Sequence, residues 1–197
     1  MKPLLEDKNA GKTKIHIDNP LAVPKFSWDL LGRLEKYDAL EARPKILLCI
    51  GTDRSTGDSL GPLVGSKMAA LEQDFFIVYG TLEQPVHASN LKEKLEEIHR
   101  FYHNPFIIAI DACLGNIDSV GCVSIGDGAL LPGAGVNKNL PPVGEIHITG
   151  IVNVGGFMEY MVLQNTRLNL VMRMADTIVK GLMLTIEQFA RPKASEM

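Results

Sequence analysis

Short apolar segments of strand length alternate with segments of helical periodicity along most of this chain, and this alternation restricts the fold more than any other feature. The apolar runs lie at 45–50 (KILLCI), 75–79 and 106–112 (FIIAIDA). Continuous runs of this kind are typical of parallel strands that are buried on both faces. Strands joined by helices imply right-handed crossovers and a mainly parallel sheet covered on both sides. The pattern predicts a three-layer α/β/α sandwich of the phosphorylase/hydrolase-like type.

The expected elements define one α/β domain over residues 26–192. Helices are predicted over about 28–41, with Ser27 as N-cap, and from Pro62 and Ser89 onward. Two short strands near 121–125 and 145–152 bring the twisted sheet to about five strands, and the first or second of them is expected to run antiparallel or at an edge. A long helix over about 166–190 follows. Residues 1–25, which contain three prolines, are predicted to form an extended or poorly ordered arm, and 193–197 a tail.

Composition excludes several classes of function. The 197 residues are 46% hydrophobic and 22% charged, with a net charge of −3, so neither nucleic-acid binding nor membrane association is expected. No apolar run approaches the ~20 residues needed to span a bilayer, and the N-terminus lacks the apolar core of a signal peptide. The three cysteines contain no C-x-x-C pair, which favours reduced thiols. We therefore predict a cytoplasmic protein.

The functional crevice of such a sheet lies beyond the carboxyl ends of its strands, where the winding reverses. In a flavodoxin-like order this point lies between the first and third predicted strands, which end at the loop 51–61 and at Asp111. Asp58 and Asp111 are therefore expected to face one crevice. The loop 131–142 is expected to border it, because its glycines allow close backbone approach to an extended peptide.

Two neighbouring carboxyl groups can divide acid and base roles between them. Both cannot ionise without cost, so one keeps its proton while the other accepts a proton from water. Asp58 precedes a predicted helix, whose N-terminus favours the charged form, so Asp58 is the expected base and Asp111 the expected acid. Each residue also has a structural interpretation. Asp58 can simply cap the helix, and Asp111 can bind backbone amides of the next turn.

Other chemistries fit the sequence less well. The loop 51–61 lacks the Walker and G-x-G-x-x-G patterns, and Ser59 in Gly-Asp-Ser-Leu has no D-x-x-H partner motif elsewhere in the chain. A metal site formed by the two aspartates with His87 or His147 stays open as an alternative. However, no H-x-x-x-H or H-E-x-x-H spacing supports it. We expect no metal and no cofactor.

Three blocks of sequence resemble a known family. Thr56–Pro62 (TGDSLGP) resembles the Thr-Pro-Asp-Ala-Leu-Gly-Pro segment of the spore germination protease, with Gly57 in place of its proline. Ile107–Ala112 resembles the second aspartate strand of that protease, and Pro132–Lys138 resembles its Pro-Gly-Ser-Gly-Val-Gly-Asn loop. The blocks lie in the same order, over about residues 45–155. Overall the chain is most similar to the shorter sporulation proteins of the YyaC group, which is related to that protease.

The resemblance implies an α/β/α fold shared with hydrogenase maturation endopeptidases and a location in the forespore or spore core of a spore-forming bacterium. It implies that Asp58 and Asp111 are the catalytic residues of an atypical aspartic-type endopeptidase, with a protein or peptide substrate such as small spore proteins. The matched blocks suggest substrate contacts at six positions: Gly51, Thr52, Gly57, Pro132, Gly133 and Gly135. The alternatives are a non-catalytic sporulation protein that binds a peptide or partner, and a metal-dependent maturation-type peptidase. Assembly into a homo-oligomer stays open.

Overall fold

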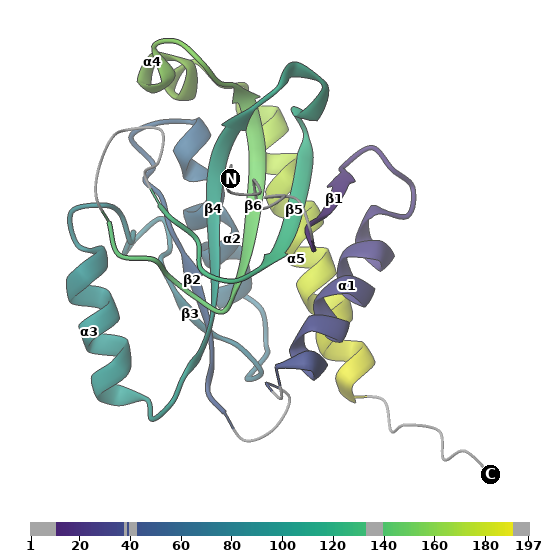
Figure 1. Ribbon diagram of the computed structural model, residues 1–197, viewed down its shortest axis with the longest axis vertical. Helices are drawn as coiled ribbons and strands as arrows, with labels where there is room; N and C mark the ends of the chain where they lie inside the picture. The colour runs from purple at the N-terminus through teal and green to yellow at the C-terminus, as the bar shows by residue number, and fades with distance from the viewer. Residues whose placement is uncertain (1–10, 38, 40–42, 133–139, 191–197) are drawn as a thin grey trace, which may run out of the picture.

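A computed structural model describes residues 11–37, 39, 43–132 and 140–190 of the chain (Figure 1). The strands of this described part form one sheet in the order β1-β5-β6-β4-β2-β3. Their bounds are β1 Thr13–His16, β2 Lys45–Cys49, β3 Ile77–Tyr79, β4 Phe106–Gly115, β5 Cys122–Asp127 and β6 Ile146–Val154.

The order and directions of the strands put the reversal of winding between β2 and β4, as the sequence predicts. Strands β3, β2, β4 and β6 are parallel, whereas β5 runs antiparallel to β6 and β1 antiparallel to β5. From β2 the chain goes first to β3 on one side and then to β4 on the other. The switch point therefore lies between β2 and β4, and its crevice opens beyond their carboxyl ends.

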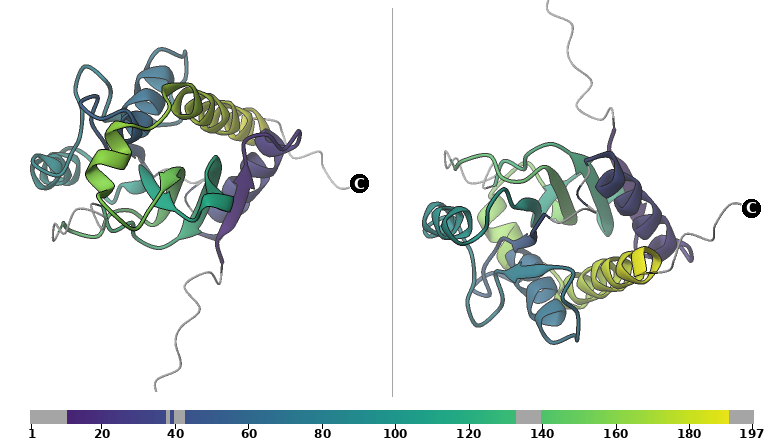
Figure 2. Two further views of the ribbon diagram at one scale, coloured as in Figure 1. Left: turned by 90° about the horizontal axis from the view of Figure 1, so that it is seen from above. Right: turned by 90° about the horizontal axis from the view of Figure 1, so that it is seen from below.

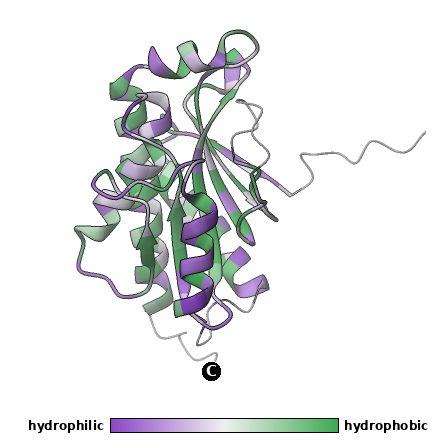
Figure 3. Ribbon diagram, turned by 90° about the vertical axis from the view of Figure 1, so that its left-hand side faces the viewer, coloured by the Kyte–Doolittle hydropathy of each residue, from purple (hydrophilic) through white to green (hydrophobic). Residues whose placement is uncertain are grey.

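Helices cover both faces of the sheet, so the predicted α/β/α architecture is confirmed (Figure 2). Helices α1 (Ala22–Lys36), α2 (Leu60–Ala69) and α5 (Leu168–Ala190) pack on one face, and α3 (Leu91–Phe101) packs on the other. The hydrophilic residues of α3 face outward (Figure 3). The short helix α4 (Glu159–Gln164) lies beyond the strand ends, near the 3₁₀ turn η1 (Gly57–Ser59) (Figure 1). A second 3₁₀ turn, η2, spans Ile117–Ser119.

Strand β2 shows why the apolar runs predict the centre of the sheet so well. All of its residues are buried. Leu47 and Cys49 belong to the core formed with α1, α2 and α5, whereas Ile46 and Leu48 belong to the core formed with α3. Successive side chains of a strand point to opposite faces, so a strand covered on both sides has no solvent face and needs no polar positions.

The N-terminal region differs from the predicted arm. Of residues 1–25, Thr13–His16 form the edge strand β1 and α1 already begins at Ala22, so the sheet has six strands among the described residues instead of about five. Pro24 lies in the first turn of α1, where a missing N–H breaks no helical hydrogen bond. The prediction was wrong because it took the prolines of this region as signs of irregular structure.

The first helix is also shifted relative to its predicted range of 28–41. Ser27 is a buried residue within α1, not its N-cap, and its hydroxyl donates to Gln188 Oε1 at 2.8 Å and so ties α1 to α5. Trp28 is exposed because the buried stripe of α1 is that of Phe26 and Leu30. None of the described helices is both long enough and apolar enough to cross a membrane.

Candidate active site

A cavity of about 820 Å³ lies at the switch point, beyond the carboxyl ends of β2 and β4. Asp58 and Asp111 both line it, so the structure brings together the two residues that the sequence pairs. The remaining walls come from the loop after β2, residues 87–89 just before α3, residues 130–132 and 140, and α4. Apart from the two aspartates, its polar and charged lining residues are Thr52, Arg54, Ser55, His87, Ser89, Cys113, Thr149, Glu159 and Tyr160.

Asp111 lies inside strand β4, next to Thr149 of β6 in the parallel register. Its Oδ1 atom accepts a hydrogen bond from the Ala112 amide at 2.8 Å, as the structural interpretation expects, while no described residue bonds to its other oxygen. Burial raises the pKa of Asp111 to about 8, and the negative charge of Asp58 adds to this effect, whereas the Ala112 amide opposes it. Asp111 therefore retains its proton at neutral pH.

Asp58 lies in the turn η1, immediately before α2. Neither η1 nor α2 has a side-chain cap, so Asp58 does not serve as the N-cap that its sequence position suggests. Burial raises the pKa of Asp58, and the nearby hydroxyl of Ser55 lowers it. Burial thus acts against the charged form that the helix N-terminus was predicted to favour. The larger pKa shift belongs to Asp111, so Asp58 loses its proton first.

The Ser55 hydroxyl was not recognised as part of the site from the sequence. This side chain is buried, and Oγ makes no hydrogen bond of standard geometry to any described residue, although it lies close enough to Asp58 to lower its pKa. A buried hydroxyl without a well-formed hydrogen bond is rare, because desolvation of the group costs free energy. Its position three residues before Asp58 was the available signal, but serine is too common in loops for this to single it out.

Gly51 shapes the base of the cavity and positions Asp58. Its φ of +147° lies in the region that favours glycine, and a Cβ atom here would lie 2.0 Å from the carbonyl oxygen of Asp58. The same carbonyl accepts a hydrogen bond from the Thr52 amide at 3.0 Å. The backbone of Asp58 is therefore packed directly against the end of β2. Gly51 and Thr52 both line the cavity, and their contact with a substrate remains a prediction.

We expect Gly51→Ala to lower the free energy of unfolding by about 1–3 kcal/mol, because the added methyl group forces the Asp58 backbone away from β2. Urea denaturation measures this change. The matched control is Gly32→Ala within α1, where a Cβ meets no atom within 4 Å. That change should raise the free energy of unfolding by about 0.5–1 kcal/mol, because alanine favours helix. Equal effects at the two positions would contradict the packing role of Gly51.

Gly57 contacts α4 instead of the cavity. A Cβ at Gly57 would lie 2.7 Å from Leu163 Cδ2, so the absent side chain allows α4 to pack directly on η1. Gly57 is not among the residues that line the cavity. Gly57 thus serves to seat a helix, and its predicted substrate contact finds no support in this placement.

The described parts of the loop 131–142 border the cavity as expected. Leu131, Pro132 and Leu140 line it. Gly133 and Gly135, two of the predicted substrate contacts, lie outside the described residues. Pro132 lines the cavity and thus remains a candidate contact.

The histidines and cysteines do not form a recognisable metal site. His87 lines the cavity, but His147 is buried in β6 and its Nδ1 lies 2.9 Å from the carbonyl oxygen of Gly128. Within the described ranges no group of three or more His, Cys, Asp or Glu side chains is arranged to hold a metal ion. Cys113 lines the cavity, and burial raises its pKa to about 11, so its thiol stays protonated at neutral pH. The expectation of a metal-free, cofactor-free site stays a prediction.

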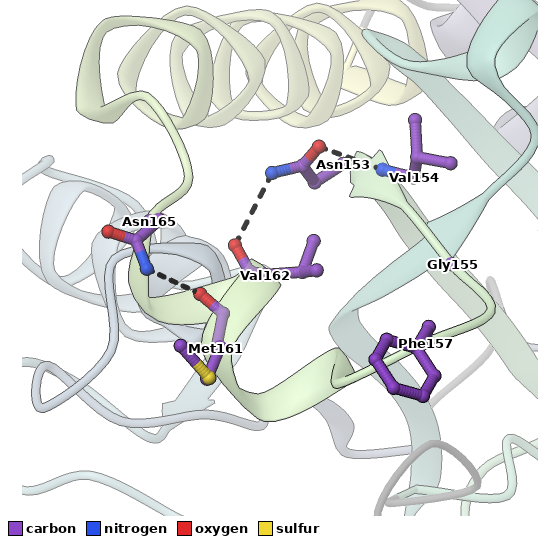
Figure 4. Close-up of a pocket in the computed structure, with 7 residues that line it drawn as sticks. All are labelled: Asn153, Val154, Gly155, Phe157, Met161, Val162 and Asn165. Atoms are coloured by element: carbon purple, nitrogen blue, oxygen red, sulfur yellow. Dashed lines mark hydrogen bonds between the residues drawn. The ribbon is translucent and has the colours of Figure 1, made fainter.

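Helix α4 supplies a wall of the cavity that sequence reasoning missed. Glu159, Tyr160 and Leu163 line the cavity. On its other side, α4 and the end of β6 line a smaller, open pocket of about 480 Å³ (Figure 4), formed by Asn153, Val154, Gly155, Phe157, Met161, Val162 and Asn165. The amide of Asn153 donates to the carbonyl oxygen of Val162 at 3.3 Å and anchors α4 to β6. The only available signal was the segment Gly-Gly-Phe-Met-Glu-Tyr, whose aromatic residues fit no predicted element.

Comparison with solved structures finds a protein of similar α/β fold. The structure is similar to that of the [NiFe] hydrogenase maturation protease HycI from Thermococcus kodakarensis KOD1, with a TM-score of 0.52 and 15% sequence identity over 78% of this chain and 99% of HycI. The molecule is thus an α/β/α protein with a HycI-like fold and two carboxyl groups in a cavity at its switch point. The chain belongs to the family described as "Protein of unknown function (DUF1256)", whose model matches residues 14–181.

A curated relative agrees with this assignment. The chain is 64% identical over 143 residues to "Uncharacterized protein YyaC" of Bacillus subtilis (strain 168). The aligned residues make up 73% of this chain and 70% of the relative. The predicted similarity to YyaC and to a hydrogenase maturation endopeptidase fold is thereby confirmed. The relation to the spore germination protease remains a prediction.

Proposed function

We propose that this protein is an aspartic-type endopeptidase of sporulating cells, in which Asp58 and Asp111 activate water against a peptide bond. The observation that carries the proposal is the pairing of two carboxyl groups with unequal pKa values in one cavity, where burial and the charge of Asp58 hold the pKa of Asp111 at about 8. Acid–base catalysis at neutral pH requires one group of such a pair to be protonated and the other charged.

The proposed reaction uses one water molecule and both aspartates. The Asp58 carboxylate accepts a proton from water as the water oxygen attacks the carbonyl carbon of the peptide. Asp111 donates its proton to the leaving nitrogen as the C–N bond breaks, which gives a carboxylic acid and an amine. The proton then returns from Asp58 to Asp111 through solvent and restores the starting state. The bond from the Ala112 amide to Asp111 Oδ1 fixes the orientation of the carboxyl group during these steps.

The substrate and the cellular setting rest on resemblance. The three blocks shared with the spore germination protease support a protein substrate, with small spore proteins as the first candidates, and a location in the forespore or spore core. The HycI-like fold supports peptidase chemistry in general terms. Asp58 and Asp111 lie within two of these blocks. The resemblance that supports the forespore or spore core as location therefore includes the residues that we propose for peptide hydrolysis.

Incubation of the purified protein with an extract of sporulating cells tests the proposal. Mass spectrometry of the peptides formed between pH 4 and pH 8 should reveal new termini that are absent when the protein is left out. The reaction should continue in the presence of a metal chelator. Cleavage lost with chelator and restored by zinc or nickel would favour the metal-dependent alternative, in which His87 of the cavity lining would bind the metal together with the aspartates. A complete absence of new termini would overturn the enzyme assignment in favour of a peptide-binding protein.

A further inference from the structure

The segment that leads into and forms α4 exposes an unusual concentration of large apolar side chains. Phe157 is 82% exposed, and four neighbours within the same short segment are exposed as well, namely Val154, Met158, Tyr160 and Met161. No residue of α4 is buried. Single exposed apolar residues are ordinary on protein surfaces, but a contiguous group of this kind marks a site of interaction.

This apolar segment is held in a defined conformation despite its exposure. Met158 adopts a left-handed backbone with φ of +49°, which is costly for a residue other than glycine. The Glu159 carboxylate accepts a hydrogen bond from the Gly156 amide at 3.2 Å, and Leu163 packs on Gly57. A surface that is anchored and backbone-strained, yet covered by nothing else in the described chain, is organised for contact with another molecule.

The position of the segment indicates what contacts it. Tyr160 and Leu163 face the cavity that contains the two aspartates, while Phe157 and Met161 line the smaller pocket on the far side of α4 (Figure 4). A bound peptide that runs from the cavity over α4 reaches the smaller pocket next. The two hollows thus provide consecutive positions for side chains of one extended peptide, and the second position is mostly apolar.

The charge of the segment and the size of its exposed surface indicate which kind of molecule binds there. Between Val154 and Asn165 the only charged side chain is Glu159, which is engaged with the Gly156 amide. The lining of the smaller pocket therefore offers no partner for a charged side chain, and the amides of Asn153 and Asn165 already donate to the carbonyl oxygens of Val162 and Met161. A stable protein dimer buries about 800 Å² per partner from about 20–30 residues a side. This segment is much smaller and suits a peptide better than a second copy of the chain.

We propose that the apolar segment 154–161 is a specificity surface that binds large apolar side chains of a peptide substrate next to the bond in the cavity. The proposal names the substrate class of the peptidase site and in that respect rests on the proposed function. Binding itself does not require cleavage. Leu, Met and Phe side chains are the expected occupants, and the peptide is expected to be extended where it crosses α4.

The experiment measures the affinity of two peptides for the Asp111→Asn protein, which keeps the surface but is expected not to cut. One probe is a fluorescein-labelled 12-residue peptide with Leu and Phe alternating with Ser and Thr, and the other has every Leu and Phe replaced by Ser. We expect the apolar peptide to bind at least about tenfold more tightly. Adding Phe157→Ser should remove most of this preference. The matched control adds Phe101→Ser, an exposed phenylalanine on α3 outside both hollows, and should leave it unchanged.

The outcomes separate this proposal from the peptidase assignment. Equal affinity for the two peptides, or no effect of Phe157→Ser, would overturn the specificity surface even if the wild type cleaves protein. Preference for the apolar peptide that depends on Phe157, without cleavage by the wild type, would support the surface and count against the enzyme. A dimer in sedimentation that Phe157→Ser converts to a monomer would show that a second copy occupies the surface. Phe157 is largely exposed, so its replacement should not affect folding.

Discussion

Replacement of Asp111 or of Asp58 by asparagine is expected to lower the rate of peptide cleavage by about 10²–10⁴-fold, the usual contribution of a positioned acid or base. Asparagine preserves the shape and polarity of the side chain but has neither a charge nor a transferable proton. Loss of either residue breaks the same proton pathway, so the double variant should be little worse than each single one. Initial rates on the peptides identified in the extract assay measure the effect.

A nearby aspartate provides the control for this loss. Asp53 lies in the same loop as Asp58, is exposed, and does not line the cavity, so Asp53→Asn should leave the rate unchanged. If Asp58 were only a helix cap, Asp58→Asn would also be nearly silent, because Asn caps about as well as Asp. Undiminished cleavage by Asp58→Asn would therefore remove this residue from the mechanism, whatever the result at Asp111.

The centre of the fold and the pairing of the two aspartates could be predicted because both depend on fully buried strands. Apart from Lys45 at the start of the first run, KILLCI and FIIAI have no polar position, which identifies strands covered on both faces. Once β2 and β4 are neighbours in a parallel sheet, their carboxyl ends meet at one edge. The position of Asp58 and Asp111 around one cavity follows from that arrangement without knowledge of the side-chain contacts.

Features that depend on tertiary packing could not be predicted in the same way. Strand β1 is short and lies at the sheet edge, where only Ile15 is buried, so its sequence carries little signal. The role of Gly57 as a seat for Leu163 depends on α4, which lies about 100 residues later. The raised pKa of Asp58 has a similar origin. Its helix position was visible in the sequence, but the burial that opposes the helix effect arises from the assembled cavity.

Asp111 is also expected to make the stability of the protein fall as the pH rises from about 4 to about 8. In the unfolded chain an aspartate has a pKa of about 3.9, whereas in the folded protein the pKa of Asp111 is about 8. Between these values the folded state holds a proton that the unfolded state has released, so each increase in pH favours unfolding. The full difference corresponds to on the order of 5 kcal/mol, and the measured loss should be smaller because the carboxyl group faces an open cavity.

Asp111→Asn removes this titration, so the variant should unfold with nearly the same free energy as the wild type at pH 4 and with a higher one, by a few kcal/mol, at pH 8. Urea denaturation at each pH measures both curves. His87, Arg54 and Glu159 also line the cavity, but they are present in both proteins and largely cancel in the difference. Parallel curves for the two proteins would contradict the raised pKa of Asp111. If Asp111→Asn is more stable than the wild type but inactive, Asp111 lowers the stability of the folded protein. Such a cost is expected for a catalytic group and not for a structural one.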